Sequence, residues 1–321
     1  MNVAVSFCNA RQINARQMLT GIGQAMVMTA LLGFVLDLKA DPGGRALVVE
    51  DDLGNRIELT AAATRIISLA PHLTEILYSL NVAQNILATV SYSDFPEAAK
   101  QIPRVGDAFS INVEKVVALQ PDIIFAWETG GANKSLRRLE QLGFTIFKNE
   151  APTLESISQT VQSMAILVGK ADEGLALSER YLNRLRHLRK QAAENNPGEA
   201  DTSDRDAPRV FFQISDQDLY TVSDGHLIGQ AIELCGGVNL FADVPIPVPL
   251  ANLEAVLGGK PDIIFITRTP DAPDSPWRSK WEQLLGAEVQ VIPIDPNLIS
   301  RPSFRMLDGI EFMCSAIQTA G

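Results

Sequence analysis

Residue types that often carry catalysis are present in this chain, but they are not spaced for it. The sequence contains Ser, Asp and His, yet it has no G-x-S-x-G nucleophile elbow, no P-loop and no G-x-G-x-x-G motif. A hydrolase needs a nucleophile and a base within hydrogen-bond reach, and the spacing nominates no such pair. Gly130 and Gly131 alone are weak evidence for a phosphate-binding loop. We therefore expect neither an enzyme nor a resident cofactor.

Metal-binding residues are equally sparse. The chain has three histidines and three cysteines, too few for most multi-histidine metal sites. His72 follows a short apolar run and could act as an axial metal ligand or a proton-linked contact. No second group of ligands accompanies it, which favours a loop histidine that faces water. We expect no metal site.

Composition narrows the remaining classes. The chain has 321 residues, of which 46% are hydrophobic, enough for one large core or two ordinary ones. The apolar content excludes disorder as a description of the whole chain. The formal net charge of −11 argues against nucleic-acid binding, which requires a clustered positive surface.

The N-terminal 40 residues have the order of an export signal. Arg11 and Arg16 precede an uncharged run over residues 18–36, and the small Ala40 is followed by a turn sequence. This order predicts a signal peptide over residues 1–40 and export to the periplasm. The alternative is an uncleaved membrane anchor, because the run is near the lower length limit for a span.

Two cysteines remain after residue 40. Cys235 and Cys314 form an even pair, and an oxidising compartment would favour a disulfide between them. Two buried free thiols are the alternative.

An internal repeat is the most informative feature of the sequence. Residues 112–125 and 252–265 are identical at eight of fourteen positions without a gap. Asn112 and Asn252 are candidate helix N-caps, and a proline ends each short helix. Each copy then continues as a short apolar run, typical of a strand buried on both faces of a parallel sheet.

Alternating helices and strands surround both copies, which predicts an α/β fold. A helical segment with apolar residues at three- and four-residue spacing lies between them and is interrupted near Gly169. We expect two Rossmann-like lobes joined by a single long helix, with a ligand cleft between the lobes. The predicted boundaries are a signal peptide at 1–40, an N-terminal lobe at 41–153, an interlobe helical segment at 154–197 and a C-terminal lobe at 198–321.

From about residue 45 onward, the chain resembles the periplasmic substrate-binding proteins of ABC importers that have a rigid interlobe helix. These proteins bind cobalamin, siderophores or haem, and the cobalamin binders are the subgroup that this chain resembles most. The resemblance rests on residues 65–75, 91–96, 103–107, 112–127 and 234–237. It implies a monomeric protein that captures a corrinoid and delivers it to a dimeric ABC permease. A ferric siderophore or haem is the alternative ligand.

The resemblance also implies a set of ligand-binding residues around the cleft. These are Pro71, His72, Tyr92, Phe109, Trp127, Gly130, Gly131, Tyr220, Val248 and Arg301. An aromatic face such as that of Tyr92 suits a flat macrocycle. Phe109 and Val248 replace tryptophans that are familiar in the cobalamin binders. On sequence alone the aromatic residues are equally compatible with ordinary, partly buried positions.

Two further roles follow from the resemblance. Cys235 and Cys314 match the disulfide pair of the family. Glu114 and Glu254, which are equivalent in the repeat, match one permease-docking glutamate in each lobe. Two such carboxylates suit a partner with twofold symmetry. Alternatively, each glutamate only stabilises the dipole in the first turn of its helix.

Overall fold

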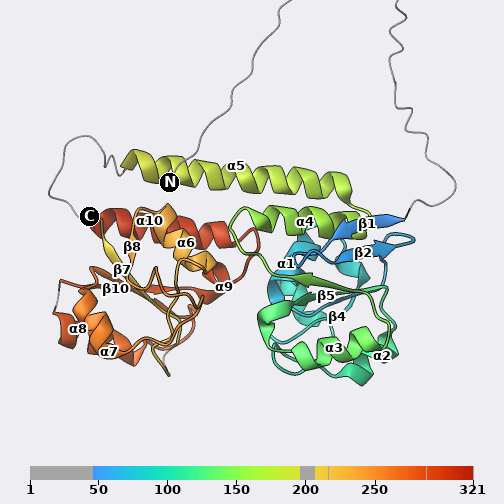
Figure 1. Cartoon of the computed structure of the whole chain (residues 1–321), viewed down its shortest axis with the longest axis horizontal. Helices are drawn as coiled ribbons and strands as arrows, with labels where there is room; N and C mark the ends of the chain where they lie inside the picture. The colour runs from blue at the N-terminus through green and yellow to red at the C-terminus, as the bar shows by residue number, and fades with distance from the viewer. Residues whose placement is uncertain (1–45, 196–206, 216, 287, 321) are drawn as a thin grey trace, which may run out of the picture. The chain divides into compact units, whose positions relative to one another are not determined.

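This computed structural model describes residues 46–195, 207–215, 217–286 and 288–320 (Figure 1). The predicted signal peptide and the predicted boundary at residue 197 lie outside the described residues. Within the described ranges, no helix is long and apolar enough to cross a membrane.

The first lobe is a parallel sheet preceded by a hairpin. Strands β1 (Leu47–Glu50) and β2 (Arg56–Leu59) pair antiparallel. The sheet contains β3 (Ile66–Ser68), β4 (Ile86–Ala88), β5 (Ile123–Trp127) and β6 (Ile146–Asn149), in the order β4-β3-β5-β6. Its helices are α1 (Pro71–Ser79), α2 (Val113–Leu119) and α3 (Asn133–Gln141), with short 3₁₀ turns at Ala83–Asn85, Glu97–Gln101 and Glu128–Gly130.

The second lobe repeats this plan. Its strands are β7 (Arg209–Gln213), β8 (Val238–Asn239), β9 (Ile263–Thr267) and β10 (Gln290–Ile294), in the order β10-β9-β7-β8. All neighbouring strands are parallel, as they are in the first sheet. The helices are α6 (Leu227–Leu234), α7 (Leu253–Gly259), α8 (Pro276–Leu285), α9 (Pro296–Ile299) and α10 (Met306–Ala320). Strands β8, β7, β9 and β10 of this sheet correspond in order to β4, β3, β5 and β6 of the first, so the two sheets have the same topology.

The repeated segments fold alike in atomic detail. The side chain of Asn112 accepts a hydrogen bond from the amide of Lys115, and that of Asn252 accepts one from the amide of Ala255, so both predicted N-caps are confirmed. The two helices end on residues in the left-handed conformation, Gln120 (φ 44°) and Lys260 (φ 47°). The duplicated sequence therefore produces a duplicated helix–strand unit.

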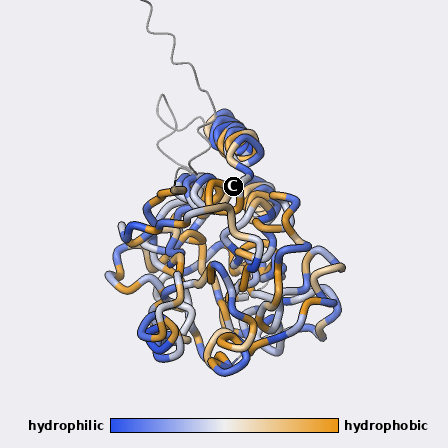
Figure 2. The backbone as a smooth tube through the Cα atoms, turned by 90° about the vertical axis from the view of Figure 1, so that its right-hand side faces the viewer, coloured by the Kyte–Doolittle hydropathy of each residue, from blue (hydrophilic) through white to orange (hydrophobic). Residues whose placement is uncertain are grey.

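Helices α4 (Ser156–Leu167) and α5 (Ala171–Asn195) connect the lobes and lie side by side (Figure 1). The chain turns between them at Gly169, whose φ of 70° a glycine adopts without strain. This break confirms the interruption predicted there. In Figure 2, α5 is seen end-on above the other elements.

The interlobe helices contribute to one hydrophobic cluster of each lobe. Val161, Met164 and Leu167 of α4 are buried in the cluster that contains strands β3 and β5. Tyr181, Leu185 and Leu188 of α5 are buried in the cluster that contains strands β7 and β9. Helix α5 is therefore part of a hydrophobic core and not only a connection between the lobes.

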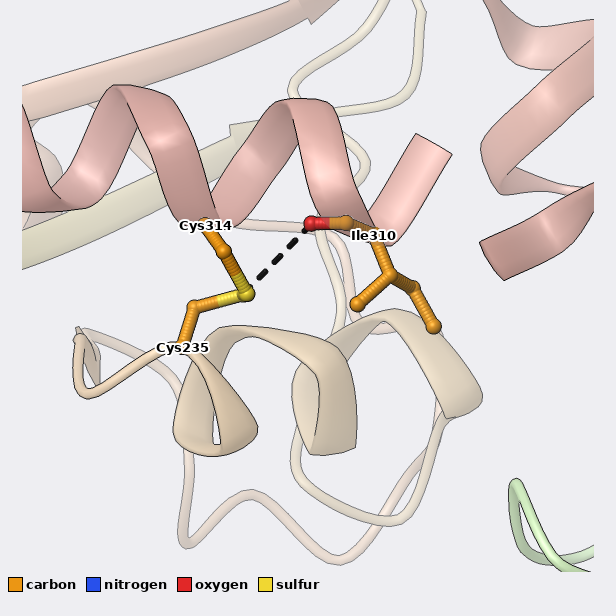
Figure 3. The surroundings of a disulfide bond; sticks show 3 residues. All are labelled: Cys235, Ile310 and Cys314. Carbon is orange, nitrogen blue, oxygen red and sulfur yellow. Dashed lines mark hydrogen bonds between the residues drawn. A yellow bond between two sulfur atoms is a disulfide. The ribbon is translucent and has the colours of Figure 1, made fainter. Parts of the chain in front are cut away.

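A disulfide joins the end of α6 to α10 in the second lobe (Figure 3). Cys235 and Cys314 have their Cα atoms 4.6 Å apart, and the sequence separation between them is 79. The predicted pairing is confirmed, and the free-thiol alternative is wrong.

Candidate functional site

The predicted ligand-binding residues follow the carboxyl ends of the strands. Trp127 is the last residue of β5, Tyr92 follows β4, and Pro71 follows β3. In the second lobe Tyr220 follows β7, Val248 follows β8, and Arg301 follows β10. Open parallel sheets bind ligands at this edge, where side chains from several loops converge. The fold therefore places these residues at the carboxyl edge of their own sheet.

Three of the predicted aromatic residues of the first lobe are exposed, and Phe95 beside Tyr92 is exposed as well. Tyr92 is 77% exposed, Phe109 is 80% exposed and Trp127 is 38% exposed. Water-exposed rings of this size are unusual on a protein that otherwise buries its large apolar side chains, and they point to a binding surface.

Hydrogen bonds within its own loop hold Phe109 in place. The Asp107 carboxylate accepts hydrogen bonds from the amides of Phe109 and Ser110, and these bonds lower the pKa of Asp107. Gly106 has φ 149°, and a Cβ atom there would lie 2.0 Å from the Ser110 carbonyl oxygen. Only glycine fits this turn, so the local sequence dictates the shape of the loop that exposes Phe109.

Gly130 and Gly131 lie against two of the rings. A Cβ atom on Gly130 would be 2.9 Å from the Trp127 ring, and one on Gly131 would be 2.8 Å from the Phe109 ring. Gly131 also has φ 96°. The two glycines therefore provide the space in which Trp127 and Phe109 approach the same backbone turn, a packing role in place of a phosphate cradle.

The loops that carry Tyr92 and Phe109 are joined. The amide and the hydroxyl of Ser91 both donate to the carbonyl of Gly106. Tyr92 itself has φ 65°, in the left-handed region that non-glycine residues seldom occupy. Such a conformation persists only where the surroundings impose it.

The second lobe contributes a mainly aliphatic surface. Tyr220 is 40% exposed and forms an isolated antiparallel bridge with Leu250. Val248 is 39% exposed, Ile246 is 59% exposed and Leu250 is 62% exposed. These three alternate with Pro245, Pro247 and Pro249, and the carbonyls of Pro247 and Pro249 accept hydrogen bonds from the amides of Ser223 and Thr221. Sequence reasoning missed Ile246 and Leu250, although the alternating prolines mark a stiff, extended segment.

The loop position predicted for His72 is wrong. Pro71 and His72 are the first residues of α1, where proline is favoured because its missing N–H costs no helix hydrogen bond. His72 is buried, donates through Nε2 to Asn149 Oδ1 (2.6 Å) and packs edge-on against Trp127. Burial lowers the pKa of His72 to about 4, so the ring is neutral near pH 7. It supports Trp127 from below instead of meeting solvent.

The polar chain behind His72 is also buried. Asn149 donates to the Asp52 carboxylate, which accepts further hydrogen bonds from the Thr160 hydroxyl and the Glu150 amide. Burial raises the pKa of Asp52 despite these bonds. The chain links the hairpin, β6 and α4, and it holds the imidazole in one orientation.

The sequence predicts that Arg301 contacts a ligand, but in the structure its hydrogen bonds go to protein groups. The residue is only 8% exposed. Its guanidinium donates to Glu75, Asp94 and Asn297 and to the carbonyl of Tyr92. Four hydrogen bonds to protein groups leave it little capacity for a ligand. Sequence reasoning missed Glu75, because no local pattern connects residues this far apart in the chain.

Glu114 and Glu254 occupy equivalent positions in α2 and α7. Each is the second residue of its helix, and each is exposed. Both helices lie on the side of their lobe that faces away from α5 (Figure 1). Neither carboxylate makes an ion pair with any residue in the described ranges.

Other candidate sites are weaker. Among the residues that the structure describes, no group of three or more His, Cys, Asp and Glu residues could hold a metal ion. A hollow of about 460 Å³ lies along α5 and contains none of the predicted ligand-binding residues. Its lining residues are Glu155, Glu179, Leu182, Asn183, Leu185, Arg186 and Arg189.

Comparison with known families identifies the class of protein. The family model described as periplasmic binding protein matches residues 66–288. Two parallel sheets joined through one long helix are consistent with this match. The chain belongs to this family of substrate-binding proteins.

Similarity to individual proteins is more specific. The chain is 35% identical to the vitamin B12-binding protein of Vibrio cholerae over 260 residues, which cover 80% of this chain and 90% of that protein. It is 31% identical to the vitamin B12-binding protein of Yersinia pestis, over 79% of this chain and 86% of that protein. The crystal structure of the periplasmic vitamin B12 binding protein BtuF of Vibrio cholerae has a TM-score of 0.71 and covers 80% of this chain and 98% of that chain.

A more distant likeness shows the fold alone. A periplasmic heme binding protein from Pseudomonas aeruginosa has a TM-score of 0.70, with 22% identity over 80% of this chain and 93% of that chain. The two-lobed fold is thus shared by proteins whose names give different ligands, so the fold does not identify the ligand.

Proposed function

We propose that this protein is a periplasmic substrate-binding protein that captures cobalamin between its two lobes and delivers it to an ABC transporter. The observation that carries the proposal is the level of identity to proteins named for vitamin B12 binding, over four-fifths of the chain. The exposed aromatic side chains at the carboxyl ends of the strands support it independently, because a flat corrin ring can pack against them. The protein acts as a monomer and catalyses no reaction, since ATP hydrolysis belongs to the transporter.

The proposed ligand-binding residues come from both lobes. Tyr92, Phe109 and Trp127 provide aromatic contacts from the first lobe, and Tyr220 and Val248 provide contacts from the second. Pro71, Gly130 and Gly131 shape the first-lobe surface. His72 supports Trp127, and Arg301 acts from behind Tyr92.

The test of the ligand is a titration of the mature chain, from residue 41, with cyanocobalamin, haem and a ferric siderophore. We expect saturable, one-to-one binding of cyanocobalamin and weaker or no binding of the others. Phe109→Ala should weaken cobalamin binding about tenfold through lost aromatic contact. Phe312→Ala is the matched control, because Phe312 is an exposed aromatic residue of α10. Tight binding of haem without cobalamin would overturn the ligand assignment.

The second part of the proposal concerns delivery. Glu114 and Glu254 are related by the internal repeat, they are exposed, and no ion pair within the described part of the chain neutralises them. They are therefore available to cationic residues of a permease whose two subunits are related by a twofold axis. A first-turn carboxylate also stabilises its own helix dipole, and this second role is compatible with docking.

The double variant Glu114→Ala with Glu254→Ala tests docking. We expect uptake to fall while cobalamin binding in solution stays unchanged, because neither residue is among the proposed ligand contacts. Glu179→Ala with Glu233→Ala is the control pair, since both glutamates are exposed on other helices. Unchanged uptake in the first double variant would refute the docking role.

A further inference from the structure

Two arginines of the second lobe reach into the first. Arg301 and Arg305 lie on the segment between α9 and α10. Glu75 of α1 is buried, and its Oε1 accepts hydrogen bonds from Arg301 (3.0 Å) and Arg305 (3.2 Å). Its Oε2 accepts a hydrogen bond from the Ser303 hydroxyl (2.5 Å). One buried carboxylate of the first lobe is thus surrounded by three residues of the second.

The same arginines also hold the loop that carries Tyr92. Arg301 donates to the Tyr92 carbonyl (3.0 Å) and to the Asp94 carboxylate (3.1 Å). Arg305 lies over the Phe95 ring, 3.7 Å from its centre. The second lobe therefore contacts three of the four residues from Tyr92 to Phe95.

The first lobe fixes the residue between these contacts. Ser93 is 1% exposed, its hydroxyl accepts a hydrogen bond from Thr89, and its carbonyl accepts one from Arg104 (2.8 Å). Tyr92 is thus held in its left-handed conformation from both lobes, while its side chain remains 77% exposed. The backbone is fixed, and the ring is free to meet a ligand.

The contacts that Arg301 and Arg305 make suit arginine side chains. A planar guanidinium can donate in several fixed directions at once, whereas a lysine ammonium is a single point charge. The two arginines are balanced by Glu75 and Asp94, so the partly buried cluster has no excess charge.

We propose that Arg301 is a positioning residue: together with Arg305 it forms an interlobe clamp that holds Tyr92 where its ring meets the ligand. This inference rests on the proposed function for the role of Tyr92 as a ligand contact. It replaces the direct ligand contact predicted for Arg301, and it makes the lobe arrangement and the ligand surface interdependent.

A double-mutant cycle tests the clamp. Tyr92→Ala and Arg301→Ala should each weaken cyanocobalamin binding about tenfold, and the double variant should be no weaker than either single variant. Additive losses would show that Arg301 contacts the ligand directly and would overturn the proposal. Arg301→Lys should not restore affinity, because lysine cannot reproduce the fork. Arg278→Ala, on an exposed arginine of α8, is the matched control.

A second variant covers the case in which Arg301→Ala fails to fold. The Asp94 side chain is 42% exposed. Asp94→Asn removes the ion pair between Arg301 and the loop while leaving Glu75 paired with both arginines. It should reproduce the loss of affinity, and it should not add to the loss caused by Tyr92→Ala. Wild-type affinity in Asp94→Asn and in Arg301→Ala would overturn the clamp.

Hydrogen exchange of the ligand-free chain separates this inference from the proposed function. We expect the amides of residues 91–95 to exchange faster in Arg301→Ala and Asp94→Asn than in wild type or Arg278→Ala. If wild type binds no corrinoid, the proposed function fails, and the exchange result alone decides whether the clamp exists. Unchanged exchange in both loop variants would refute the clamp even if cobalamin binds.

Discussion

The two lobes share one frame, the parallel sheet with its packed helices, but they differ in the loops that connect these elements. Helix α2 and strand β5 recur as α7 and β9 at an offset of 140 residues, with equivalent caps and sheet orders. The carboxyl-end loops have diverged: those of the first lobe expose Tyr92 and Phe109, whereas the loop after β8 exposes aliphatic side chains between prolines. The frame determines where the candidate ligand-binding site lies, and the loops determine which side chains line it.

The lobes also differ in how they are stabilised. A disulfide crosslinks the second lobe, whereas the first lobe contains a largely buried polar chain that runs from His72 through Asn149 to Asp52. Four tests follow from the comparison of the two lobes.

Removal of the disulfide should cause the largest loss of stability. In the chain-entropy model, a loop of the size closed by Cys235 and Cys314 contributes roughly 4 kcal/mol, so Cys235→Ser with Cys314→Ser should lower the Tm by roughly 10 °C. Calorimetry measures the loss. Hydrogen exchange should rise in α6 and α10 more than in α1. Equal loss of protection in both lobes would contradict a local role for the bond.

Acid should destabilise both lobes through one histidine in each. Burial lowers the pKa of His72 and of His226 to about 4, so the folded state disfavours their charged forms. Their contribution to stability is complete above the unfolded pKa near 6.5 and is lost as the pH falls from there toward 4. Together they should remove roughly 3 kcal/mol of unfolding free energy between pH 7 and pH 5.

Urea titrations at several pH values measure the slope of the unfolding free energy against pH. His226→Asn keeps an oxygen at the N-cap of α6, where His226 accepts from the Ile228 amide, and His72→Gln keeps a donor for Asn149. Each variant should remove about half of the slope. Asp52 acts in the opposite direction, because burial raises its pKa and protonation favours the folded state at lower pH. A slope unaffected by either histidine variant would contradict the assignment.

Gly131→Ala should disturb the first-lobe surface specifically. At φ 96° an alanine costs about 1–2 kcal/mol, and its Cβ atom would displace the Phe109 ring. Gly143→Ala is the control, because Gly143 has φ 86° but open space around the added Cβ. Both variants should lose similar stability, but only Gly131→Ala should lose ligand affinity. Equal affinity in the two variants would show that Phe109 does not contact the ligand.

The smallest effect tests whether the repeated caps are energetically equivalent. Asn112→Ala and Asn252→Ala each remove one side-chain bond to a backbone amide, and each should cost about 1 kcal/mol in urea unfolding. We expect the two losses to agree within about 0.5 kcal/mol, the usual tolerance for independent sites. A larger difference would mean that the lobes have diverged in their frame as well as in their loops.

Local patterns predicted most of the frame. The N-cap, helix, proline and apolar run over residues 112–125 specify a helix–strand unit through short-range physics, and the second copy removes ambiguity about its existence. The break near Gly169 was predictable for the same reason. Helix α10 was missed, although its apolar residues have helical spacing.

The environment of the site was less predictable. The sequence predicts a loop at His72, but the preceding proline, which follows a short strand, can equally begin a helix, and only the fold decides. The burial of His72 and the contacts of Arg301 depend on residues far away in sequence, such as Asn149 and Glu75. No periodicity encodes such pairs. The exposed aromatic residues could be recognised only through resemblance, because exposure is a tertiary property.

The shared core has a consequence for the order in which the chain can fold. Tyr181, Leu185 and Leu188 of α5 are synthesised before the strands that cover them, and their cluster also includes Ile310 and Met313 of α10. Helix α4 covers part of the apolar side of α5, and the remainder therefore stays uncovered until α10 has been synthesised. Cys314, which closes the disulfide, lies in that same last helix. The second lobe therefore completes its core and its disulfide only when α10 docks.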